Sequence, residues 1–275
     1  MAQYLEDEIE NFQPLAKQAR RDILEMIYRR KAPHIGCSFS IVDILTVLYF
    51  KILKVDPKNP SNPGRDRFIL SKGHAVPALY AILYQRGFLD KEFLNSFAVD
   101  GGSLEAHPDR NILQGIEAST GSLGHGLSLG AGMALTGKRD KANYRVFTLL
   151  GDGELDEGSC WEAIMFASHN KLDNLVAIVD KNQCQILGRT SEVLELEPLA
   201  DKWRSFGWAT KEIGGHDFKG LLSTLSNLPF EVGKPSCIIA NTTKGKGVSF
   251  MENEIRWHDK HPDEEEYKIA LSELN

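Results

Sequence analysis

The chain lacks the features that mark secreted, membrane-spanning or nucleic-acid-binding proteins. Its four cysteines are scattered and form no CxxC pair, so the sequence predicts neither a structural zinc site nor a disulfide framework. Its longest apolar runs, such as ILTVLYF and LVAIV, are too short to cross a bilayer. A net charge of −6 disfavours binding to nucleic acid or to an anionic membrane. Since the acidic N-terminus is unlike a signal peptide, we expect a soluble, cytoplasmic protein.

The second half of the chain alternates short apolar strands with helices. The apolar spacing predicts strands at 144–150, 174–180, 208–213 and 236–242. It predicts intervening helices over 157–171, 198–206 and 217–228. Because the strands are continuously apolar and are separated by helices, we expect an α/β fold in which a parallel sheet carries helices on both faces.

The first half contains helices and loops that elaborate the same domain. We expect helices over 4–31, 40–53 and 76–88, a turn-rich loop at 57–66, and a Gly- and Ala-rich loop that enters a helix within 115–136. The sequence has no internal repeat and no low-complexity linker. We therefore predict a single domain over residues 1–275.

Two successive strands end in polar residues that suit a metal ion. Asp152 lies between Gly151 and Gly153 after the first strand, and Asn182 follows Asp180 after the second. The carboxyl ends of parallel strands are where such sheets bind ligands. Carboxylate and amide oxygens suit Mg²⁺ or Ca²⁺, with phosphate oxygens completing the shell. The sequence therefore predicts a divalent cation that binds a diphosphate, which also explains how an acidic protein holds an anion.

Two other interpretations of these glycines remain open. A lone Gly-Asp-Gly is equally well an ordinary turn. The segment GSLGHG at 121–126 has the composition of a nucleotide-binding loop. Its glycines, however, are spaced GxxGxG and follow no convincing strand, which disfavours a Rossmann motif.

Several segments carry a resemblance to a known family. GDGELDEGSCWEA followed by VDKN closely resembles the thiamine diphosphate-binding motif of transketolases. Further segments occur in the family's order, namely HIGCSFSIVDIL, SKGHAVPALYAIL, EAHPD, STGSLGHGLSLGAGMAL, TTKGKGVSF and WH. The resemblance covers nearly the entire chain and corresponds to the N-terminal, diphosphate-binding domain of the family. It implies the thiamine diphosphate-binding fold, with thiamine diphosphate and Mg²⁺ as cofactors and Ca²⁺ as the alternative metal.

The resemblance also implies roles for individual residues. It implies metal ligation by the Asp152 carboxylate, the Asn182 side chain and the backbone carbonyl of Cys184. It implies cofactor contacts with His74, Gly121, Ser122, Leu123, Asp152, Gly153, Asn182, Ile186, Lys244 and His258. Among these, the Gly153 backbone resembles a diphosphate donor, and Ile186 matches a residue that holds the cofactor bent. Ser122 stands where the family has Pro. For Lys244, an ordinary solvated lysine is an equally good interpretation.

Four of the histidines are candidates for the catalytic chemistry. They are His34, His74, His107 and His258. The resemblance implies that the first and third lie near the reacting sugar oxygens and the other two near the diphosphate, where neutral imidazoles would relay protons. A single histidine in a turn is more often structural, and His125, His169 and His216 are interpreted that way. Asp259 replaces the Gly that usually follows the WH motif, so the role of this loop and of His261 is open.

The resemblance further implies an enzyme divided between two chains. In the family, the glutamate that activates the cofactor and most sugar-phosphate ligands lie in pyrimidine-binding and C-terminal domains, which residues 1–275 do not include. We therefore expect a partner in the form of a separate C-terminal subunit, and a heterotetramer with two copies of each chain. The paired subunits would transfer a two-carbon ketol unit from a ketose phosphate to an aldose. The alternatives are a subunit of a 2-oxo-acid dehydrogenase first component, a deoxyxylulose-phosphate synthase-like protein, or a non-catalytic homologue.

Overall fold

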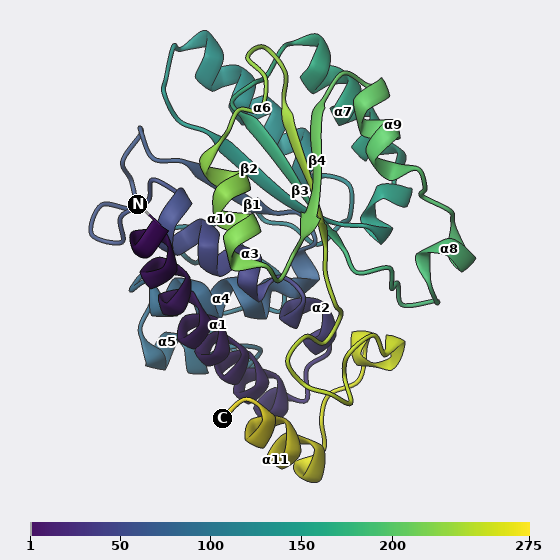
Figure 1. The fold of residues 1–275 in the computed structure, drawn as a ribbon. Helices are drawn as coiled ribbons and strands as arrows, with labels where there is room; N and C mark the ends of the chain where they lie inside the picture. The colour runs from purple at the N-terminus through teal and green to yellow at the C-terminus, as the bar shows by residue number, and fades with distance from the viewer. Residues whose placement is uncertain (1) are drawn as a thin grey trace.

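A single parallel sheet organises the molecule (Figure 1). The computed structural model describes residues 2–275, with side chains from Glu8 onward. The strands are β1 (Arg67–Leu70), β2 (Val146–Gly151), β3 (Leu175–Lys181), β4 (Ala209–Gly214) and β5 (Ser236–Asn241). They pair in the order β1-β2-β3-β5-β4, and every pair is parallel. The predicted parallel sheet is therefore confirmed, and the short edge strand β1 adds to the four strands that the sequence predicts.

Helices cover both faces of this sheet (Figure 1). The α-helices are α1 (Ala2–Arg30), α2 (Ile35–Phe39), α3 (Val42–Val47), α4 (Val76–Gln85), α5 (Lys91–Asn95), α6 (Gly126–Arg139), α7 (Gly158–His169), α8 (Thr190–Val193), α9 (Leu199–Ser205), α10 (Phe218–Ser226) and α11 (Glu264–Glu273). A π-helical turn, η1 (Leu48–Ile52), continues α3, and 3₁₀ turns η2 (Gly73–Ala75), η3 (Gly153–Asp156) and η4 (Ile255–His258) complete the elements. The predicted helix over 40–53 thus corresponds to α3 and η1.

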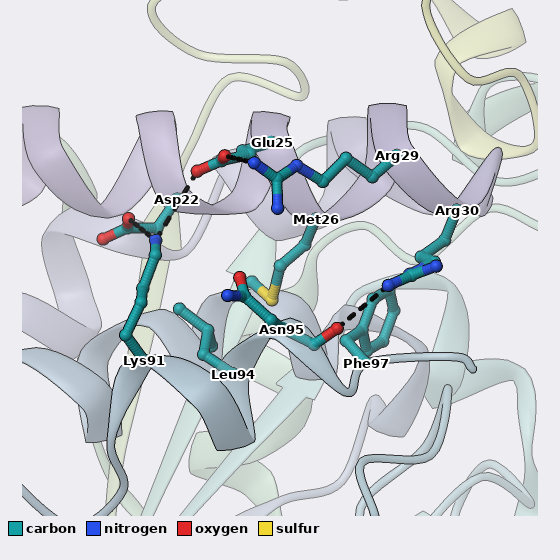
Figure 2. A pocket seen from close by; sticks show the side chains of 9 residues that line it. All are labelled: Asp22, Glu25, Met26, Arg29, Arg30, Lys91, Leu94, Asn95 and Phe97. Carbon is teal, nitrogen blue, oxygen red and sulfur yellow. Dashed lines mark hydrogen bonds and ion pairs between the residues drawn. The ribbon is translucent and has the colours of Figure 1, made fainter. Parts of the chain in front are cut away.

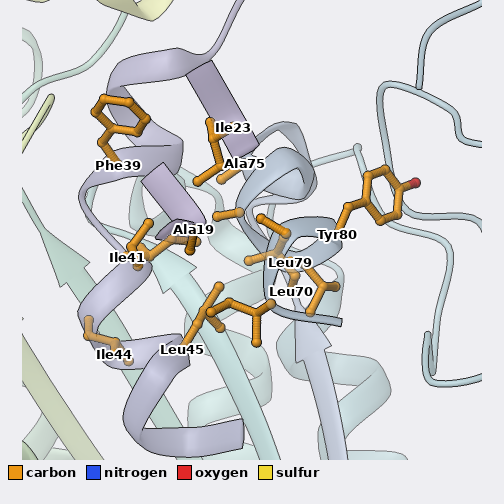
Figure 3. Packing of buried hydrophobic residues seen from close by; sticks show 14 of the residues in the cluster. Ala19, Ile23, Phe39, Ile41, Ile44, Leu45, Leu70, Ala75, Leu79 and Tyr80 are labelled. Carbon is orange, nitrogen blue, oxygen red and sulfur yellow. The ribbon is translucent and has the colours of Figure 1, made fainter. Parts of the chain in front are cut away.

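The larger core lies between the sheet and the N-terminal helices. Alternate strand residues such as Phe68, Leu70 and Leu149 point into it, because successive side chains of a strand face opposite sides. Figure 3 shows Ile23 of α1 beside Ala75, and Leu45 of α3 farther along the same buried layer. Helices α1, α3, α4 and α10 all contribute buried residues to it. This core fixes the segments that precede and follow β1.

A second core lies on the opposite face of the sheet. The intervening strand residues, including Ile69, Leu150 and Val179, pack against α6, α7 and α9. Trp203 of α9 is completely buried there and stacks edge-on against Trp208, with ring centroids 4.8 Å apart. Strands β2 and β3 are buried on both faces, which explains why their sequences are continuously apolar.

A polar seam joins α1 to α5 at the edge of the molecule (Figure 2). The Lys91 ammonium lies 3.3 Å from an Asp22 carboxylate oxygen and 3.5 Å from Glu25, and Arg30 donates to the backbone carbonyl of Asn95 over 3.0 Å. The hollow between these side chains has a volume of only about 10 Å³. That volume suits one water molecule at most, so the seam is a helix contact and not a ligand site.

Two further predictions are settled by the fold. All four cysteines are free and buried, so the expected absence of disulfides is confirmed. No helix within residues 2–275 is both long enough and apolar enough to span a membrane.

Candidate functional site

A cavity of about 230 Å³ opens where the strands end. Its lining comes from the segments that follow β1, β2, β3 and β5, together with α2 and η4. The lining residues are His34, Cys37, Lys72, His74, His107, Gly121, Leu123, Gly151, Asp152, Gly153, Glu154, Asn182, Cys184, Gln185, Ile186, Lys244 and His258. This set contains every predicted site residue except Ser122, which is exposed and does not line the cavity. Segments more than 200 residues apart in sequence, such as His34 and His258, therefore meet at one edge of the sheet.

The predicted metal ligands lie side by side on the cavity wall. One carboxylate oxygen of Asp152 accepts a hydrogen bond from Gly153 N–H over 2.8 Å, and the other accepts from Gln183 N–H over 2.5 Å. The Asn182 amide oxygen accepts from the backbone N–H of Cys184 over 3.1 Å. Gly153 is thus engaged by Asp152 here, and its assignment to the diphosphate stays a prediction.

Asp180 anchors the floor of the site. It is fully buried and accepts hydrogen bonds from Lys72 Nζ over 2.5 Å, Ser40 Oγ over 2.7 Å, Asn182 Nδ2 over 2.9 Å and Thr242 Oγ1. Burial opposes its ionisation, but Lys72 and the other donors hold its pKa below the ordinary value. The Asn182 nitrogen donates to Asp180 and its oxygen accepts from Cys184 N–H, so one lone pair of the amide oxygen is left for the cavity.

Glu154 plays the corresponding role beneath the loop that enters α6. Its buried carboxylate accepts from Ser71 Oγ, from Gly124 N–H over 2.9 Å and from Gly151 N–H over 3.1 Å. Burial raises its pKa despite these donors. The carboxylate thereby fixes the loop after β1, the loop before α6 and the turn after β2 relative to one another.

The four candidate histidines form one cluster. The His34 ring centroid lies 5.1 Å from that of His74, 5.4 Å from that of His258 and 6.3 Å from that of His107. Burial and the neighbouring His107 lower the pKa of His34 to about 4, and burial and the ammonium of Lys244 lower that of His258 to about 3. Burial also lowers the pKa of His74 well below its ordinary value. These three imidazoles are therefore neutral at pH 7.

Lys244 gives the cavity a buried positive charge. Its residue surface is only 1% exposed, so the alternative of a solvated lysine is wrong. Its Nζ lies 3.0 Å from His258 Nδ1, and burial followed by the nearby Lys72 charge lowers its pKa. Among the residues whose side chains are described, no carboxylate forms an ion pair with it. A buried ammonium without a counter-ion favours an anion in the cavity.

The donor set fits a metal only in partnership with such an anion. No group of three or more His, Cys, Asp or Glu side chains in the described part of the chain is arranged to hold a metal by itself. Asp152 and Asn182 supply two side-chain oxygens, which is too few for Mg²⁺ but suits a shell completed by phosphate oxygens and water. Burial and the Asp180 charge raise the pKa of Asp152 to about 6, so a cation would relieve an unfavourable local charge.

One glycine permits the close approach of two cavity walls. A Cβ at Gly36 would lie 3.0 Å from the Trp257 carbonyl and 3.1 Å from Lys244 Cγ. The absence of a side chain therefore lets α2 pack against the stem of Lys244, whose ammonium then points toward His258.

The rim of the cavity differs from its floor. Ile186 is 56% exposed and Leu187 is 81% exposed, although both are large apolar residues. Both follow the turn at Gln183, which has a positive φ of 62°. Two large apolar side chains therefore remain in contact with water beside the cavity.

Two charged residues on which this geometry depends carry no predicted role. They are Lys72, within the SKGHA segment, and Glu154, within GDGELDEG. Both side chains are buried and pair with distant residues. Lys72 donates to Asp180, 108 residues away, and Glu154 accepts from Ser71, 83 residues away. A lysine between a buried strand and a tight turn was the available signal for Lys72. Glu154, three residues after Gly151, carried no distinguishing signal.

Comparison with known proteins gives one consistent family. The family model described as transketolase, thiamine diphosphate binding domain, matches residues 13–274. An apulose-4-phosphate transketolase subunit of Phocaeicola vulgatus is 43% identical over 268 residues, covering 98% of this chain and 95% of that protein. The 6-deoxy-6-sulfo-D-fructose transketolase subunit SqwG of a Clostridium species is 44% identical over 264 residues, covering 96% of each.

Solved structures agree with the sequence relatives. Transketolase from Campylobacter jejuni superposes with a TM-score of 0.91 at 32% identity, covering 96% of this chain and 42% of that chain. Transketolase from Leishmania mexicana gives a TM-score of 0.90 at 29% identity and likewise covers 96% of this chain and 41% of that chain. The chain therefore spans about two fifths of these solved transketolases.

Proposed function

The chain belongs to the transketolase family, and we propose that it is the diphosphate-binding subunit of a transketolase whose active site is completed by a partner chain. The observation that carries the proposal is the charge pattern of the cavity. Lys244 brings a buried positive charge that no carboxylate from Glu8 onward pairs with, and Asp152 and Asn182 bring oxygen ligands to the same cavity. A metal-bound diphosphate satisfies both at once.

The donor chemistry supports thiamine diphosphate and Mg²⁺ at this site. Asp152, the Asn182 amide oxygen and the Cys184 carbonyl would hold the metal, while Lys244 and His258 would face the diphosphate. Ile186 on the rim would pack against the organic part of the cofactor. The bound cofactor supplies a nucleophilic carbon and an electron sink for breaking a carbon–carbon bond.

The histidine cluster suits the proton transfers of such a reaction. His34 and His107 would contact the hydroxyl and carbonyl oxygens of the sugar, and His74 and His258 would lie toward the diphosphate. Because burial lowers the pKa of His34 to about 4, its imidazole is neutral at pH 7 and able to accept a hydroxyl proton. A neutral ring also avoids repulsion with the buried ammonium of Lys244.

A partner subunit follows from the length of the relatives and from the open rim. Two relatives that match this chain over almost their entire length are named as subunits. We propose that the partner supplies the activating glutamate and most sugar-phosphate ligands, in a heterotetramer with two copies of each chain. Four free, buried cysteines support a reducing compartment, and we propose that the assembly is cytoplasmic.

The proposed reaction moves a two-carbon ketol unit from a ketose phosphate to an aldose. The relatives named above act on apulose 4-phosphate and on 6-deoxy-6-sulfo-D-fructose, so their donors are ketoses that carry an anionic group. The charge of Lys244 is at the diphosphate end of this cavity, so it does not select among such sugars. Selection would fall to the partner.

A donor assay with the reconstituted pair tests the proposal. The chain is co-expressed with the C-terminal transketolase subunit of its own organism and is supplied with thiamine diphosphate, Mg²⁺ and an aldose acceptor. We expect ketol transfer from a panel of ketose phosphates, including xylulose 5-phosphate, and no turnover of pyruvate. Pyruvate turnover without ketol transfer would assign another thiamine diphosphate reaction, and failure to bind the cofactor would indicate a non-catalytic homologue.

A further inference from the structure

We infer that His216 is a positioning residue that holds Lys244 in the cavity, an inference that rests on the proposed function. His216 lies outside the cavity, in the loop between β4 and α10. Its Nε2 accepts a hydrogen bond from the backbone N–H of Thr243 over 2.8 Å. Its Nδ1 lies 2.6 Å from a carboxylate oxygen of Asp43. The imidazole thus bridges α3 to the residue that immediately precedes Lys244.

The partners of His216 determine its tautomer. A backbone N–H can only donate, so Nε2 must be the unprotonated nitrogen. Nδ1 therefore carries the proton and donates it to Asp43. Asp43 is itself buried and held by Arg20, whose two terminal nitrogens lie 2.9 and 2.8 Å from its two oxygens. This bidentate contact leaves the carboxylate one orientation in which to receive the histidine.

The loop that carries His216 is packed directly onto the end of β5. Gly215 donates to the Asn241 carbonyl over 2.7 Å, and a Cβ at Gly215 would lie 2.3 Å from Thr242 Cγ2. The two segments are therefore in contact over their backbones as well as through the imidazole. Thr242 in turn donates to Asp180, so residues 242–244 are tied to the floor on one side and to His216 on the other.

Lys244 depends on this anchoring because nothing of opposite charge among the described side chains holds it. Within the part of the chain whose side chains are described, its ammonium has His258 as its hydrogen-bond partner, while its backbone carbonyl accepts from Asn253 N–H over 2.8 Å. A long side chain without an ion pair keeps its place through the backbone to which it is attached. Release of Thr243 from His216 would let the Lys244 ammonium withdraw from the diphosphate position.

Two substitutions separate the two hydrogen bonds of His216. His216→Asn places an amide nitrogen near the Nδ1 position and loses the acceptor for Thr243. His216→Gln places an amide oxygen near the Nε2 position and keeps that acceptor. We expect His216→Asn to weaken binding of thiamine diphosphate by a factor of about 10, the size of effect that the loss of one hydrogen bond produces. His216→Gln is expected to restore most of the affinity.

The test uses the complex of this chain with its C-terminal subunit, titrated with thiamine diphosphate at saturating Mg²⁺. In a Lys244→Met background, His216→Asn is expected to change the dissociation constant by less than about twofold, because its effect passes through Lys244. A purely structural role predicts the same loss in both backgrounds, and that result would overturn the inference. Wild-type affinity in His216→Asn would overturn it as well. The matched control is His169→Asn, an exposed histidine at the end of α7.

A second measurement uses the wild-type protein, so it does not depend on whether a variant folds. Hydrogen exchange of the wild-type complex without cofactor should show the Thr243 amide protected, and exchange at the rate of a free loop would contradict the anchoring. If the wild-type complex binds no thiamine diphosphate while Thr243 is protected, the proposed function fails and the anchoring stands.

Discussion

The floor and the rim of the cavity differ in how their side chains are buried and bonded. On the floor, Asp180 accepts four side-chain hydrogen bonds and Glu154 accepts three hydrogen bonds, all from within the chain. On the rim, Ile186 and Leu187 remain 56% and 81% exposed. The floor is thus a finished polar structure, whereas the rim leaves apolar surface uncovered.

This difference separates the part of the site that the chain completes by itself from the part that it leaves open. The satisfied floor fixes the proposed metal ligands and the buried lysine before any ligand arrives, which is the preorganisation that a binding site needs. The uncovered rim leaves the site open to a cofactor and to a partner chain. Substitutions on the floor should therefore lower both the free energy of unfolding and the affinity for the cofactor. Substitutions on the rim should affect only the assembly with the partner chain and the packing of the cofactor.

The largest expected effect comes from breaking the floor at Asp180. Asp180→Asn leaves the Lys72 ammonium buried without its counter-charge, so we expect the free energy of unfolding to fall by about 3–5 kcal/mol. Urea unfolding of the free chain measures the loss. The double variant Asp180→Asn/Lys72→Met should recover part of it, because no unpaired charge remains. A single variant within about 1 kcal/mol of wild type would contradict the role of this pair.

Asp152→Asn separates binding from stability at the cavity wall above this floor. We expect affinity for thiamine diphosphate in the presence of Mg²⁺ to fall by about 100-fold, at the top of the range known for groups that merely support a metal ligand. The fold should tolerate the change, because loss of the buried charge beside Asp180 offsets the loss of one of the two backbone hydrogen bonds that the carboxylate accepts. Asp173→Asn, before β3 and paired with Lys138, is the matched control. Unchanged affinity in Asp152→Asn would refute the metal assignment.

The histidine cluster predicts how stability responds to acid. The folded-state pKa of His34 is about 4 and that of His258 about 3, below the unfolded value of about 6.5. Their contribution is complete above pH 6.5 and is lost as the pH falls toward these folded values, at up to about 1.4 kcal/mol per pH unit for each histidine. The His258→Asn variant should therefore show a shallower decline in unfolding free energy between pH 6.5 and 4. A slope equal to that of wild type would contradict the low pKa.

The smallest effects are expected on the rim. Ile186→Ala should leave the unfolding free energy of the free chain within about 0.5 kcal/mol of wild type, because the side chain is already in water. In the assembled complex, the same change should weaken cofactor binding by about 1 kcal/mol, or roughly fivefold, since apolar contact with the cofactor is lost. Destabilisation of the free chain by more than about 2 kcal/mol would show that Ile186 belongs to the core and would remove the distinction between rim and floor.

The parallel sheet and the placement of Asp152 and Asn182 at one cavity could be predicted because both depend on local pattern. Continuous apolar strands and the polar residues at their ends locate Asp152 and Asn182 without any tertiary information. The supporting side chains depend on pairings between distant segments. Nothing local marks Lys72 as the partner of Asp180, or His216 as the acceptor for Thr243. The burial of Lys244 likewise arises from the packing of Gly36 against it.

The central claim is that the carboxyl edge of the sheet binds a diphosphate through a divalent cation. Calorimetric titration of thiamine diphosphate into the assembled complex, with Mg²⁺ and then with excess EDTA, tests it most directly. We predict one cofactor bound for each copy of this chain with Mg²⁺, and affinity reduced by at least about 100-fold after chelation. Binding of equal strength without any divalent cation, or no binding in its presence, would contradict the claim.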